Sequence, residues 1–411
     1  MAIFGAGKRA RAWRVGVCGA LCLPVLSCGG GGGGSLSAAS SAPTGSNVAG
    51  IVVDAGPTST SPDVNTLFTT VTVCVPGTAS CQTIDHIQVD TASYGLRLLA
   101  PVLTLSLPVQ TAANGASLLE CTQFVDGYSW GPVTLADVKI SGESASSVPV
   151  QVIGDPSFAT VPANCSSVGP AEDTVAAFGA NGILGVGVFD QDCGPVCVST
   201  VDNGDYFACT ATLCENTAEP LAEQVANPVA LFAKDNNGSI MEFPSVASQG
   251  AATVTGSLTF GIDTQTNNAS GSETVLTVDP NFGYLTASFN GQTLSMSFID
   301  SGSNGIFFDD TAIAACTATD YTEFYCPAST LNLTVALQGN NGVNATVNFA
   351  VDNAQSLGTN NPSFVVFSTL AGSNPTSGSF DYGLPFFFGR RVATALENRT
   401  TTVGTGPYIA Y

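Results

Sequence analysis

Apolar positions alternate with polar ones in two matching segments of the chain, and a short polar turn interrupts each segment. In the first, strands are predicted over Val71–Val75 and Ile84–Val89. In the second, strands are predicted over Leu285–Phe289 and Leu294–Ile299, with Asn290-Gly291 as the tight turn between them. Asn-Gly is favoured in two-residue hairpin turns, and short runs rich in β-branched and aromatic residues favour strands. Each segment therefore predicts a β-hairpin.

Each predicted hairpin runs directly into an aspartate and a similar polar turn. Residues Val89–Gly95 read Val-Asp-Thr-Ala-Ser-Tyr-Gly, and residues Ile299–Gly305 read Ile-Asp-Ser-Gly-Ser-Asn-Gly. One such turn would mean little, because Asp, Ser and Gly suit many polar turns. Two copies after similar hairpins predict two similar lobes. Two carboxyl groups can act as general acid and general base in hydrolysis, so Asp90 and Asp300 are the candidate catalytic residues.

Composition favours an all-β fold. The chain is rich in Val, Thr, Ser and Gly, and only 10% of its residues are charged, so few helix-forming charged stretches are present. β-Branched residues are enriched in strands. Downstream of its Asp turn, each half also has an apolar pair closed by glycine, namely Leu184-Gly185 and Phe388-Gly389. The repeat therefore extends well beyond the aspartates.

The paired Asp turns and the two apolar-Gly segments resemble those of pepsin-like aspartic proteases. The resemblance covers about residues 65–395, and the sequence is also similar to an uncharacterised group of proteobacterial lipoproteins. It implies an all-β, two-lobed pepsin-like fold with a cleft between the lobes. One Asp from each lobe would form the catalytic dyad, and Leu184-Gly185 and Phe388-Gly389 would pack beside the two turns.

The same resemblance assigns roles to the hydroxyl groups of the turns. Thr91 and Ser301 would cross-link the two turns by hydrogen bonds, while Ser93 and Ser303 would hold the outer carboxylate oxygens. Ala92 departs from the family pattern, which has Gly at its place. A Cβ there would displace the dyad if the position requires a close approach by neighbouring atoms.

A flap over the cleft is expected from Tyr128-Ser129-Trp130-Gly131, followed by a strand over Val133–Ile140. By resemblance, Tyr128 would close over an extended peptide, and Trp130 and Gly131 would belong to the same substrate-binding hairpin. The peptide backbone would pair with the flap and the cleft edges like an added strand.

The N-terminus has the pattern of a targeting segment. Basic residues up to Arg14 precede the apolar run Val15–Leu26, which is too short to span a bilayer. The run ends in Val25-Leu26-Ser27-Cys28, which resembles a bacterial lipobox with Cys28 as the lipidated residue. We therefore expect a signal peptide over 1–27 and a Gly/Ser-rich tether over 28–47, with ordinary secretion after cleavage as the alternative.

This pattern predicts an exported bacterial lipoprotein on the periplasmic side of the outer membrane or on the cell surface, because Gly29 after the cysteine resembles the outer-membrane sorting pattern. The first lobe is expected over 48–248 and the second over 249–411. In the second lobe, Ser257–Ile262 is expected to be a strand of the sheet between the lobes.

Cysteine spacing supports export. Ten cysteines follow Cys28, and an even number at short spacings favours disulfides over metal ligands. The pairs expected are Cys74–Cys81, Cys121–Cys165, Cys193–Cys197, Cys209–Cys214 and Cys316–Cys326. A zinc site is the alternative. Its four ligands would be Cys193, Cys197, Cys209 and Cys214.

The chain has a single histidine, His86, which we expect to be a partly exposed strand residue. A Ser-His-Asp or Cys-His hydrolase would need it as the base, and a zinc hydrolase would usually need more imidazoles. No phosphate-binding Gly-Lys-Ser/Thr sequence and no dinucleotide-binding glycine pattern is present. We therefore expect neither a metal nor a cofactor.

The formal net charge is −21, with 31 acidic residues against 10 basic ones. Nucleic acid and anionic membrane surfaces are therefore unsuitable partners. The expected partners are a peptide or protein substrate and a membrane reached through the lipid anchor, and the protein is expected to be a monomer.

Three functions are compatible with these features. The first is a membrane-anchored aspartic endopeptidase that hydrolyses peptide bonds with water activated by an Asp-Asp dyad. The second is a catalytically inactive pepsin-like fold that binds peptides or envelope partners. The third is an adhesive β-sandwich lipoprotein in which the two Asp turns are a coincidence.

Overall fold

The structure, a computed structural model, describes residues 44–57, 63–374 and 376–411. The predicted signal peptide (1–27), the candidate lipidation site Cys28 and most of the predicted tether (28–47) lie outside these residues. None of the helices in the described ranges has the length and apolar character needed to cross a bilayer.

Strands predominate in the described residues. Those of the first half are β1 (Val48–Val53), β2 (Leu67–Cys74), β3 (Cys81–Asp90), β4 (Tyr94–Leu99), β5 (Ser117–Gln123), β6 (Tyr128–Ile140), β7 (Glu143–Ile153), β8 (Gly182–Val186), β9 (Tyr206–Cys209), β10 (Cys214–Asn216) and β11 (Gly238–Glu242). Those of the second half are β12 (Val254–Phe260), β13 (Val275–Thr277), β14 (Leu285–Phe289), β15 (Gln292–Ile299), β16 (Ile306–Phe307), β17 (Leu331–Gln338), β18 (Asn344–Val351), β19 (Ala371–Gly372), β20 (Asp381–Tyr382), β21 (Arg391–Ala395), β22 (Thr400–Thr401), β23 (Gly404–Thr405) and β24 (Tyr408–Ala410).

The helices are short connectors. The α-helices are α1 (Ala163–Ser166), α2 (Val175–Phe178), α3 (Pro195–Ser199) and α4 (Ala354–Asn360). The 3₁₀ turns are η1 (Ala100–Val102), η2 (Pro156–Phe158), η3 (Leu221–Glu223), η4 (Pro228–Leu231), η5 (Thr266–Asn268), η6 (Thr319–Tyr321) and η7 (Leu384–Phe386).

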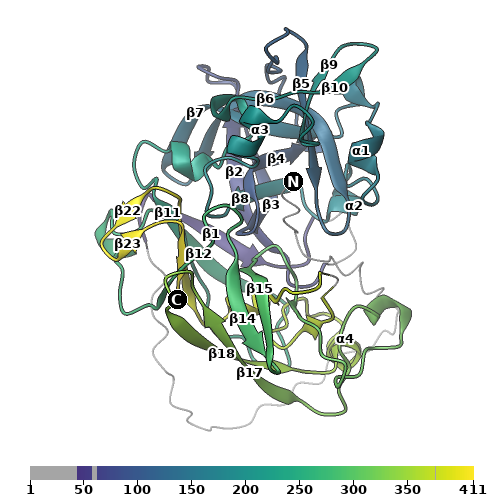
Figure 1. Ribbon diagram of the computed structural model, residues 1–411, viewed down its shortest axis with the longest axis vertical. Coiled ribbons are helices and arrows are strands. Elements are labelled where there is room, and N and C mark those ends of the chain that lie inside the picture. Colours follow the sequence, from purple (N-terminus) through teal and green to yellow (C-terminus); the bar gives the residue numbers. More distant parts are fainter. Residues whose placement is uncertain (1–43, 58–62, 375) are drawn as a thin grey trace, which may run out of the picture.

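The strands form two large sheets within the described residues. The larger has the order β10-β9-β5-β6-β7-β4-β8-β3-β2-β1-β12-β11-β21-β24-β13, and the smaller has the order β18-β17-β14-β15-β20-β16-β19. In Figure 1 the strands β2 to β10 fill the upper lobe, β1 lies beside β12 between the lobes, and β14, β15, β17 and β18 lie in the lower lobe. The C-terminal strands β21 and β24 return to the larger sheet, where β21 pairs with β11. The all-β, two-lobed fold predicted from the sequence is confirmed.

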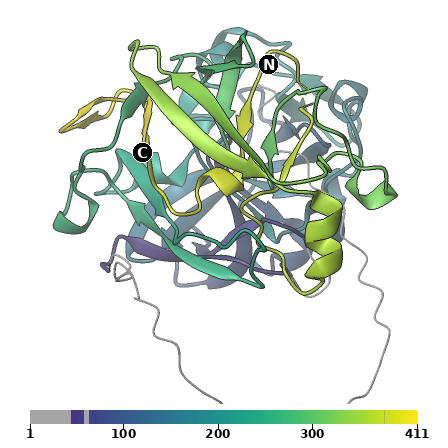
Figure 2. The same cartoon turned by 90° about the horizontal axis from the view of Figure 1, so that it is seen from below.

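Sequence-distant segments meet at the junction of the lobes. β12 pairs with both β1 and β11, so a strand from the start of the second half lies between two strands of the first. Seen from below in Figure 2, the yellow-green β17–β18 hairpin lies across the second lobe, with α4 beside it. The limits of 48–248 and 249–411 for the two lobes stay predictions.

Both predicted hairpins are present. β2 and β3 pair with Cys74 opposite Cys81, and β14 and β15 pair with Phe289 opposite Gln292. Asn290 and Gly291 form the turn of the second hairpin with φ values of 48° and 75°. Two positive φ values are what a type I′ hairpin turn requires, and Asn and Gly adopt them at the least cost. The Asn-Gly signal therefore predicts this turn correctly.

Five disulfides confirm the expected pairing: Cys74–Cys81, Cys121–Cys165, Cys193–Cys197, Cys209–Cys214 and Cys316–Cys326. The zinc alternative is wrong for the four cysteines of the third and fourth pairs, because each sulfur is bonded to another sulfur and is not a thiolate ligand. Asp205 approaches the third disulfide, with Oδ2 at 3.5 Å from Cys193 Sγ.

A hydrophobic core continues across the lobe junction. One cluster contains Val89 and Leu184 of the first lobe together with Ile299 and Tyr382 of the second. All four side chains are buried and belong to the strands that carry or flank the Asp turns. Full burial of an aliphatic side chain is worth about 1.5–3 kcal/mol, so this core holds the two turns against each other.

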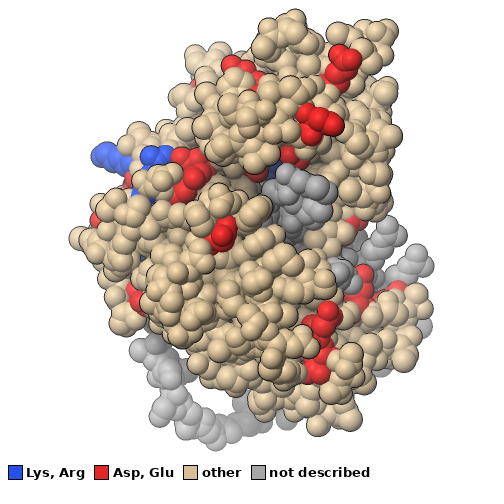
Figure 3. All heavy atoms as spheres, in the orientation of Figure 1, with Lys and Arg blue, Asp and Glu red and all other residues tan. Residues whose placement is uncertain are grey.

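Charged side chains are sparse on the surface. On the face shown in Figure 3, Asp and Glu are scattered over both lobes, whereas Lys and Arg gather at one edge. His86 is partly exposed on β3, as predicted, and its ring nitrogens lie within 3.4 Å of carboxylate oxygens of Asp54 and Asp85.

Candidate active site

The two Asp turns meet at the junction of the lobes. β3 ends at Asp90, and β15 ends one residue before Asp300; both aspartates are 0% exposed. A Cβ built on Gly302 would lie 2.9 Å from Asp90 Cγ and 3.0 Å from Asp300 Oδ1. Both carboxyl groups therefore flank the same point in space and form a pair.

The two turns bind their own carboxylates in the same way. Asp90 Oδ1 accepts a hydrogen bond from Ala92 N, and Asp300 Oδ1 accepts one from Gly302 N, each at 2.7 Å. An Asp side chain that accepts from the backbone two residues later is a common way to fix a turn. Ala92 and Gly302 are thus equivalent positions. Ala92 is not among the described residues with positive φ, so its backbone accommodates a Cβ.

Thr91 and Ser301 cross-link the turns. Thr91 Oγ1 accepts from Ser301 N at 3.0 Å and donates to Ile299 O at 3.0 Å. Ser301 Oγ accepts from Thr91 N at 3.1 Å and donates to Val89 O at 2.8 Å. Each hydroxyl therefore bonds two backbone groups of the opposite lobe. Four buried hydrogen bonds at about 1 kcal/mol each hold the carboxyl groups in register.

Each Asp turn is backed by a short strand inserted between the strands on either side of the turn. β8 lies between β3 and β4, with Gly185 opposite Asp90. β20 lies between β15 and β16, with Tyr382 opposite Ile299. The second-lobe counterpart of Leu184-Gly185 is therefore Tyr382-Gly383.

The expectation that Phe388-Gly389 packs beside the second turn is wrong. Those residues follow η7, where Phe388 packs against the ring of Phe243. Gly383 instead meets the close approach that the site demands, since a Cβ there would lie 2.0 Å from Gly305 O. An apolar pair closed by Gly is a short signal, and strand pairing decides which copy lies beside the turn.

The outer carboxylate oxygens differ between the lobes. Ser303 Oγ lies 2.8 Å from Asp300 Oδ2, as expected. Ser93 Oγ and Asp90 Oδ2 are both buried and have no hydrogen-bond partner within the described residues. The bond expected from Ser93 to Asp90 is therefore not formed, and the local two-fold symmetry ends at this point.

A third buried carboxyl, which the sequence patterns did not single out, adjoins the pair. Asp381 on β20 is 4% exposed, and its Oδ2 lies 2.6 Å from Ser303 Oγ. Ser303 thus bridges Asp381 and Asp300. The sequence does contain a signal, an Asp two residues before Gly383, but the equally apolar Phe388-Gly389 competes with Tyr382-Gly383 for the same role.

Burial governs the protonation of this cluster. It raises the pKa of the Asp300 carboxyl well above its usual value, and the neighbouring Asp90 and Asp381 raise that pKa further. Burial also raises the pKa of Asp381, against a lowering effect of the hydrogen bond from Ser303. Close carboxyl groups cannot all ionise cheaply, so protons remain within the cluster.

The residues expected to form the flap lie at the start of β6, and their role as a flap stays a prediction. β5 and β6 form a hairpin with Gln123 opposite Tyr128, but Tyr128 bonds through its backbone to Pro170. Trp130 is buried, stacks edge-on with Phe207 and donates to a backbone carbonyl. A Cβ on Gly131 would lie 1.9 Å from a carbonyl oxygen of β7. Within the described residues, no hydrogen bond or ring contact joins these three to either Asp turn.

A small cavity adjoins the first Asp turn. Its volume is about 20 Å³, and Thr91, Ala92 and Tyr94 line one side while Phe282 and Phe298 line the other. A space of this size holds a single water-sized molecule. Neither Asp90 nor Asp300 lines this cavity.

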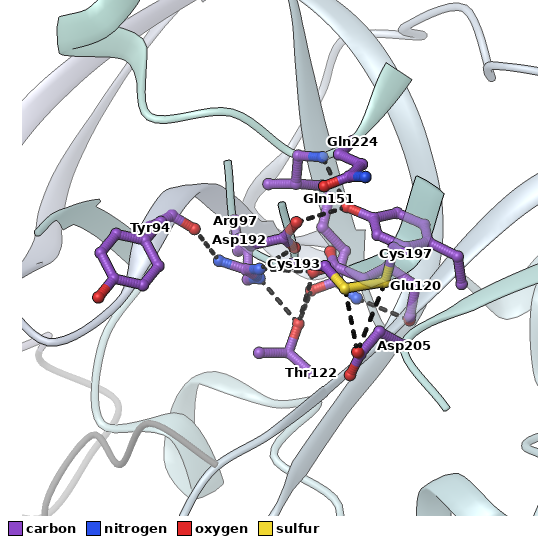
Figure 4. Close-up of polar contacts among 12 residues, drawn as sticks. Tyr94, Arg97, Glu120, Thr122, Gln151, Asp192, Cys193, Cys197, Asp205 and Gln224 are labelled. Carbon is purple, nitrogen blue, oxygen red and sulfur yellow. Dashed lines mark hydrogen bonds and ion pairs between the residues drawn. A yellow bond between two sulfur atoms is a disulfide. The ribbon is translucent and has the colours of Figure 1, made fainter. Parts of the chain in front are cut away.

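A buried arginine fixes the exit of the first turn. Figure 4 shows Arg97 among the side chains that converge on it from neighbouring strands and loops. Its Nη1 donates to Tyr94 O at 2.7 Å, and its Nη2 pairs with Glu120 at 2.5 Å and with Asp192 at 2.8 Å. Tyr206 donates a further bond to Asp192 at 2.7 Å. The ion pairs thus tie the first Asp turn to β5 and to the loop after β8.

Comparison with known proteins adds a family and a fold neighbour. A family model described as "Protein of unknown function (DUF3443)" matches residues 43–411. An aspartic proteinase from Irpex lacteus has a similar solved structure, with 14% identity, 88% of this chain and 96% of that chain covered, and a TM-score of 0.49. A search of curated proteins found no match.

Proposed function

The chain belongs to the family described as a protein of unknown function (DUF3443), and from the geometry of its Asp turns we propose that it is an aspartic endopeptidase. The observation that carries this proposal is the buried pair of Asp90 and Asp300, on two turns whose hydrogen bonds mirror each other. No Lys, Arg or His of the described residues bonds to either carboxyl. The pair is therefore built to share a proton rather than to neutralise a cation.

The mechanism follows from that shared proton. Asp300, whose pKa is raised, carries the proton and donates it to the scissile carbonyl oxygen. Asp90 takes a proton from the attacking water, whose oxygen bonds to the carbonyl carbon. When the C–N bond breaks, the leaving nitrogen takes the proton from Asp90, and the hydroxyl formed on the carbonyl oxygen returns its proton to Asp300. Two like charges at such close range cannot both ionise cheaply, so one carboxyl is always available as acid and the other as base.

The cross-links give the dyad its preorganisation. The hydrogen bonds of Thr91 and Ser301 fix the two turns relative to each other, so the carboxyl groups need not reorganise during the reaction. Because both aspartates are 0% exposed, a peptide requires an opening movement of the segments around the site. Loop or domain movement of this kind commonly gates hydrolases.

We also propose that the protein acts as a monomer on peptides or proteins in the cell envelope, held there by a lipid on Cys28. The lipobox-like sequence before Cys28 supports this placement. Metabolic labelling with a fatty acid, compared between the native chain and Cys28→Ser, tests the anchor. Label in both proteins, or in neither, contradicts it.

A catalytically inactive, peptide-binding protein is the second candidate, and Ala92 favours it. The equivalent position in the second turn has no room for a Cβ without a shift of the carboxyl groups. By the equivalence of the two turns, we expect the methyl group of Ala92 to lie against the carboxyl groups.

A cleavage assay separates the two candidates. The full chain in detergent is incubated with a mixed-peptide library from about pH 3 to about pH 7, the range in which carboxyl dyads work. Asp300→Asn and a pepstatin-type inhibitor are run in parallel. Cleavage that is lost in both controls supports the endopeptidase. Binding of peptides without cleavage, at equal stability of the native and Asp300→Asn proteins, supports the binding protein.

A further inference from the structure

Asp381 is one hydroxyl group away from the proposed dyad. Ser303 Oγ lies 2.8 Å from Asp300 Oδ2 and 2.6 Å from Asp381 Oδ2. The other oxygen of Asp381 is buried and has no hydrogen-bond partner within the described residues. The three side chains therefore form a chain of hydrogen bonds that starts at the dyad and ends in the core of the second lobe.

Counting the hydrogen atoms available to these hydrogen bonds shows that one carboxyl group must be protonated. A serine hydroxyl has one hydrogen and can donate to only one of two carboxylates. Both contacts of Ser303 have hydrogen-bond length, so the second contact needs a hydrogen from a carboxyl group. Either Asp300 or Asp381 must then be protonated. With Asp90 and Asp300 sharing one proton in the active form, the proton of this link belongs to Asp381.

Among the described residues, no cation lies beside Asp381 to neutralise its charge in place of that proton. The titratable groups that face it are Asp300 from the second turn and Asp90 from the first, both acidic. β15 and β16 place phenylalanines opposite Asp381, and η7, which follows it, has only uncharged side chains. No Lys, Arg or His of the described residues makes an ion pair or hydrogen bond with it. A buried carboxylate without a cation is costly, and protonation removes that cost.

The first lobe has no such group. By strand register, Ile183 on β8 is the counterpart of Asp381 on β20, since they pair with Gln88 and Phe298 at equivalent positions. Ser93, the counterpart of Ser303, accordingly has an unpartnered hydroxyl within the described residues. The third carboxyl is therefore a specific addition to one side of the pair.

We propose that Asp381 is a positioning residue that holds a proton at the acid end of the active range and loses it before Asp300 does, so that its charge beside Ser303 preserves the dyad proton to higher pH. This inference rests on the proposed endopeptidase function. When Asp381 finally ionises, its negative charge makes removal of the proton from Asp300 more difficult. The alkaline limit of activity then lies higher than two carboxyl groups alone would allow.

The test compares Asp381→Asn with Asp235→Asn in the full chain. The amide of the first variant can still donate to Ser303, but it cannot ionise. Asp235 is a buried Asp of the first lobe that bonds to Gln265, and it serves as the matched control. We expect the alkaline limb of the kcat/KM profile to move about one pH unit or more toward acid in Asp381→Asn. The acid limb, and both limbs in the control, should stay in place.

An unchanged alkaline limb in Asp381→Asn would overturn the proposal. Should this variant not fold, Asp381→Ile supplies the residue that the first lobe has at the same place, and the same shift is expected. A role of Asp381 in packing alone would lower stability without moving either limb.

A second measurement does not depend on turnover. Because a buried acid with a raised pKa destabilises the fold as pH rises, removing it should stabilise the protein more at high pH than at low pH. We expect Asp381→Asn to gain Tm relative to the native chain between about pH 4 and about pH 8. A constant Tm difference contradicts the proton assignment. If the native chain cuts nothing but the Tm difference grows with pH, the proposed function fails while the proton on Asp381 stands.

Discussion

Replacing Ala92 by glycine should increase the activity of the dyad. Ala92 and Gly302 are equivalent, because each donates its N–H to its own Asp at 2.7 Å. The second turn has no side chain at this position, whereas the first has a methyl group, which we expect beside the carboxyl groups because the turns are equivalent. Removal of this methyl group restores on the first side the space that the second side already has.

The magnitude can be estimated from the second turn. A Cβ at Gly302 would lie 2.9 Å from Asp90 Cγ, against about 3.5–4.0 Å for an ordinary contact between carbon atoms. A carboxyl group facing such a methyl must therefore move by about 0.5–1 Å. Since a misplacement of 1 Å can cost about 100-fold in rate, Ala92→Gly should raise kcat/KM by about 10- to 100-fold. The added backbone freedom should cost about 1 kcal/mol of stability.

The assay measures kcat/KM on one cleaved peptide for the native chain, Ala92→Gly, Gly302→Ala and the double variant. Gly302→Ala should lose about 100-fold, because it introduces the same contact against the other carboxyl. The double variant, which moves the methyl from one turn to the other, should resemble the native chain more than either single variant does. Equal kcat/KM for the native chain and Ala92→Gly would refute the reasoning, provided that Gly302→Ala folds.

Three further outcomes follow from buried groups elsewhere. The pKa values of Asp300 and Asp381 are raised in the folded protein, so their stabilising effect is complete below the ordinary carboxyl pKa of about 3.9. This effect is lost as pH rises toward the folded pKa values. Denaturant titrations from about pH 4 to about pH 8 should therefore show a falling free energy of unfolding. Arg97→Met should lower the free energy of unfolding by about 3–5 kcal/mol, because two buried carboxylates lose their cation, and a loss under 1 kcal/mol in the same titration would contradict this. Replacing both Cys121 and Cys165 by Ala, which opens a loop with a sequence separation of 44, should cost about 4 kcal/mol and lower the thermal midpoint.

The hairpins and Asp turns could be predicted because their signals are local. Leu285–Phe289 alternates apolar and polar residues, and it coincides with β14 in the structure. Asn290 and Gly291 specify a turn by their backbone preferences alone. The cross-linking hydroxyls stand next to the Asp residues in the chain, so each turn carries the side chains for these bonds, although their partners lie in the opposite lobe.

Features that depend on pairing between distant strands could not be read in the same way. Phe387-Phe388-Gly389 has the expected apolar pair before glycine and Asp381-Tyr382-Gly383 does not, yet the parallel pairing of β20 with β15 places Tyr382-Gly383 beside the turn. The packing of Tyr128 and Trp130 in one cluster with Phe207 likewise depends on strands that are distant in the sequence. A short motif predicts the type of local structure, whereas the residues that it contacts in space depend on the whole fold.

The two Asp turns differ in the hydrogen bonds on their outer side, and these differences distinguish the two aspartates chemically. The cross-links of the two turns have matching partners, so the frame of the dyad is nearly two-fold symmetric. The differences lie on the outer side, where Ser303 bridges two carboxyl groups while Ser93 has no partner within the described residues. Polar support on one side alone makes the two aspartates inequivalent before any substrate binds. Burial raises the pKa of Asp300 against the lowering effect of the Ser303 bond, so in the proposed endopeptidase Asp300 would hold the proton and Asp90 would act as the base.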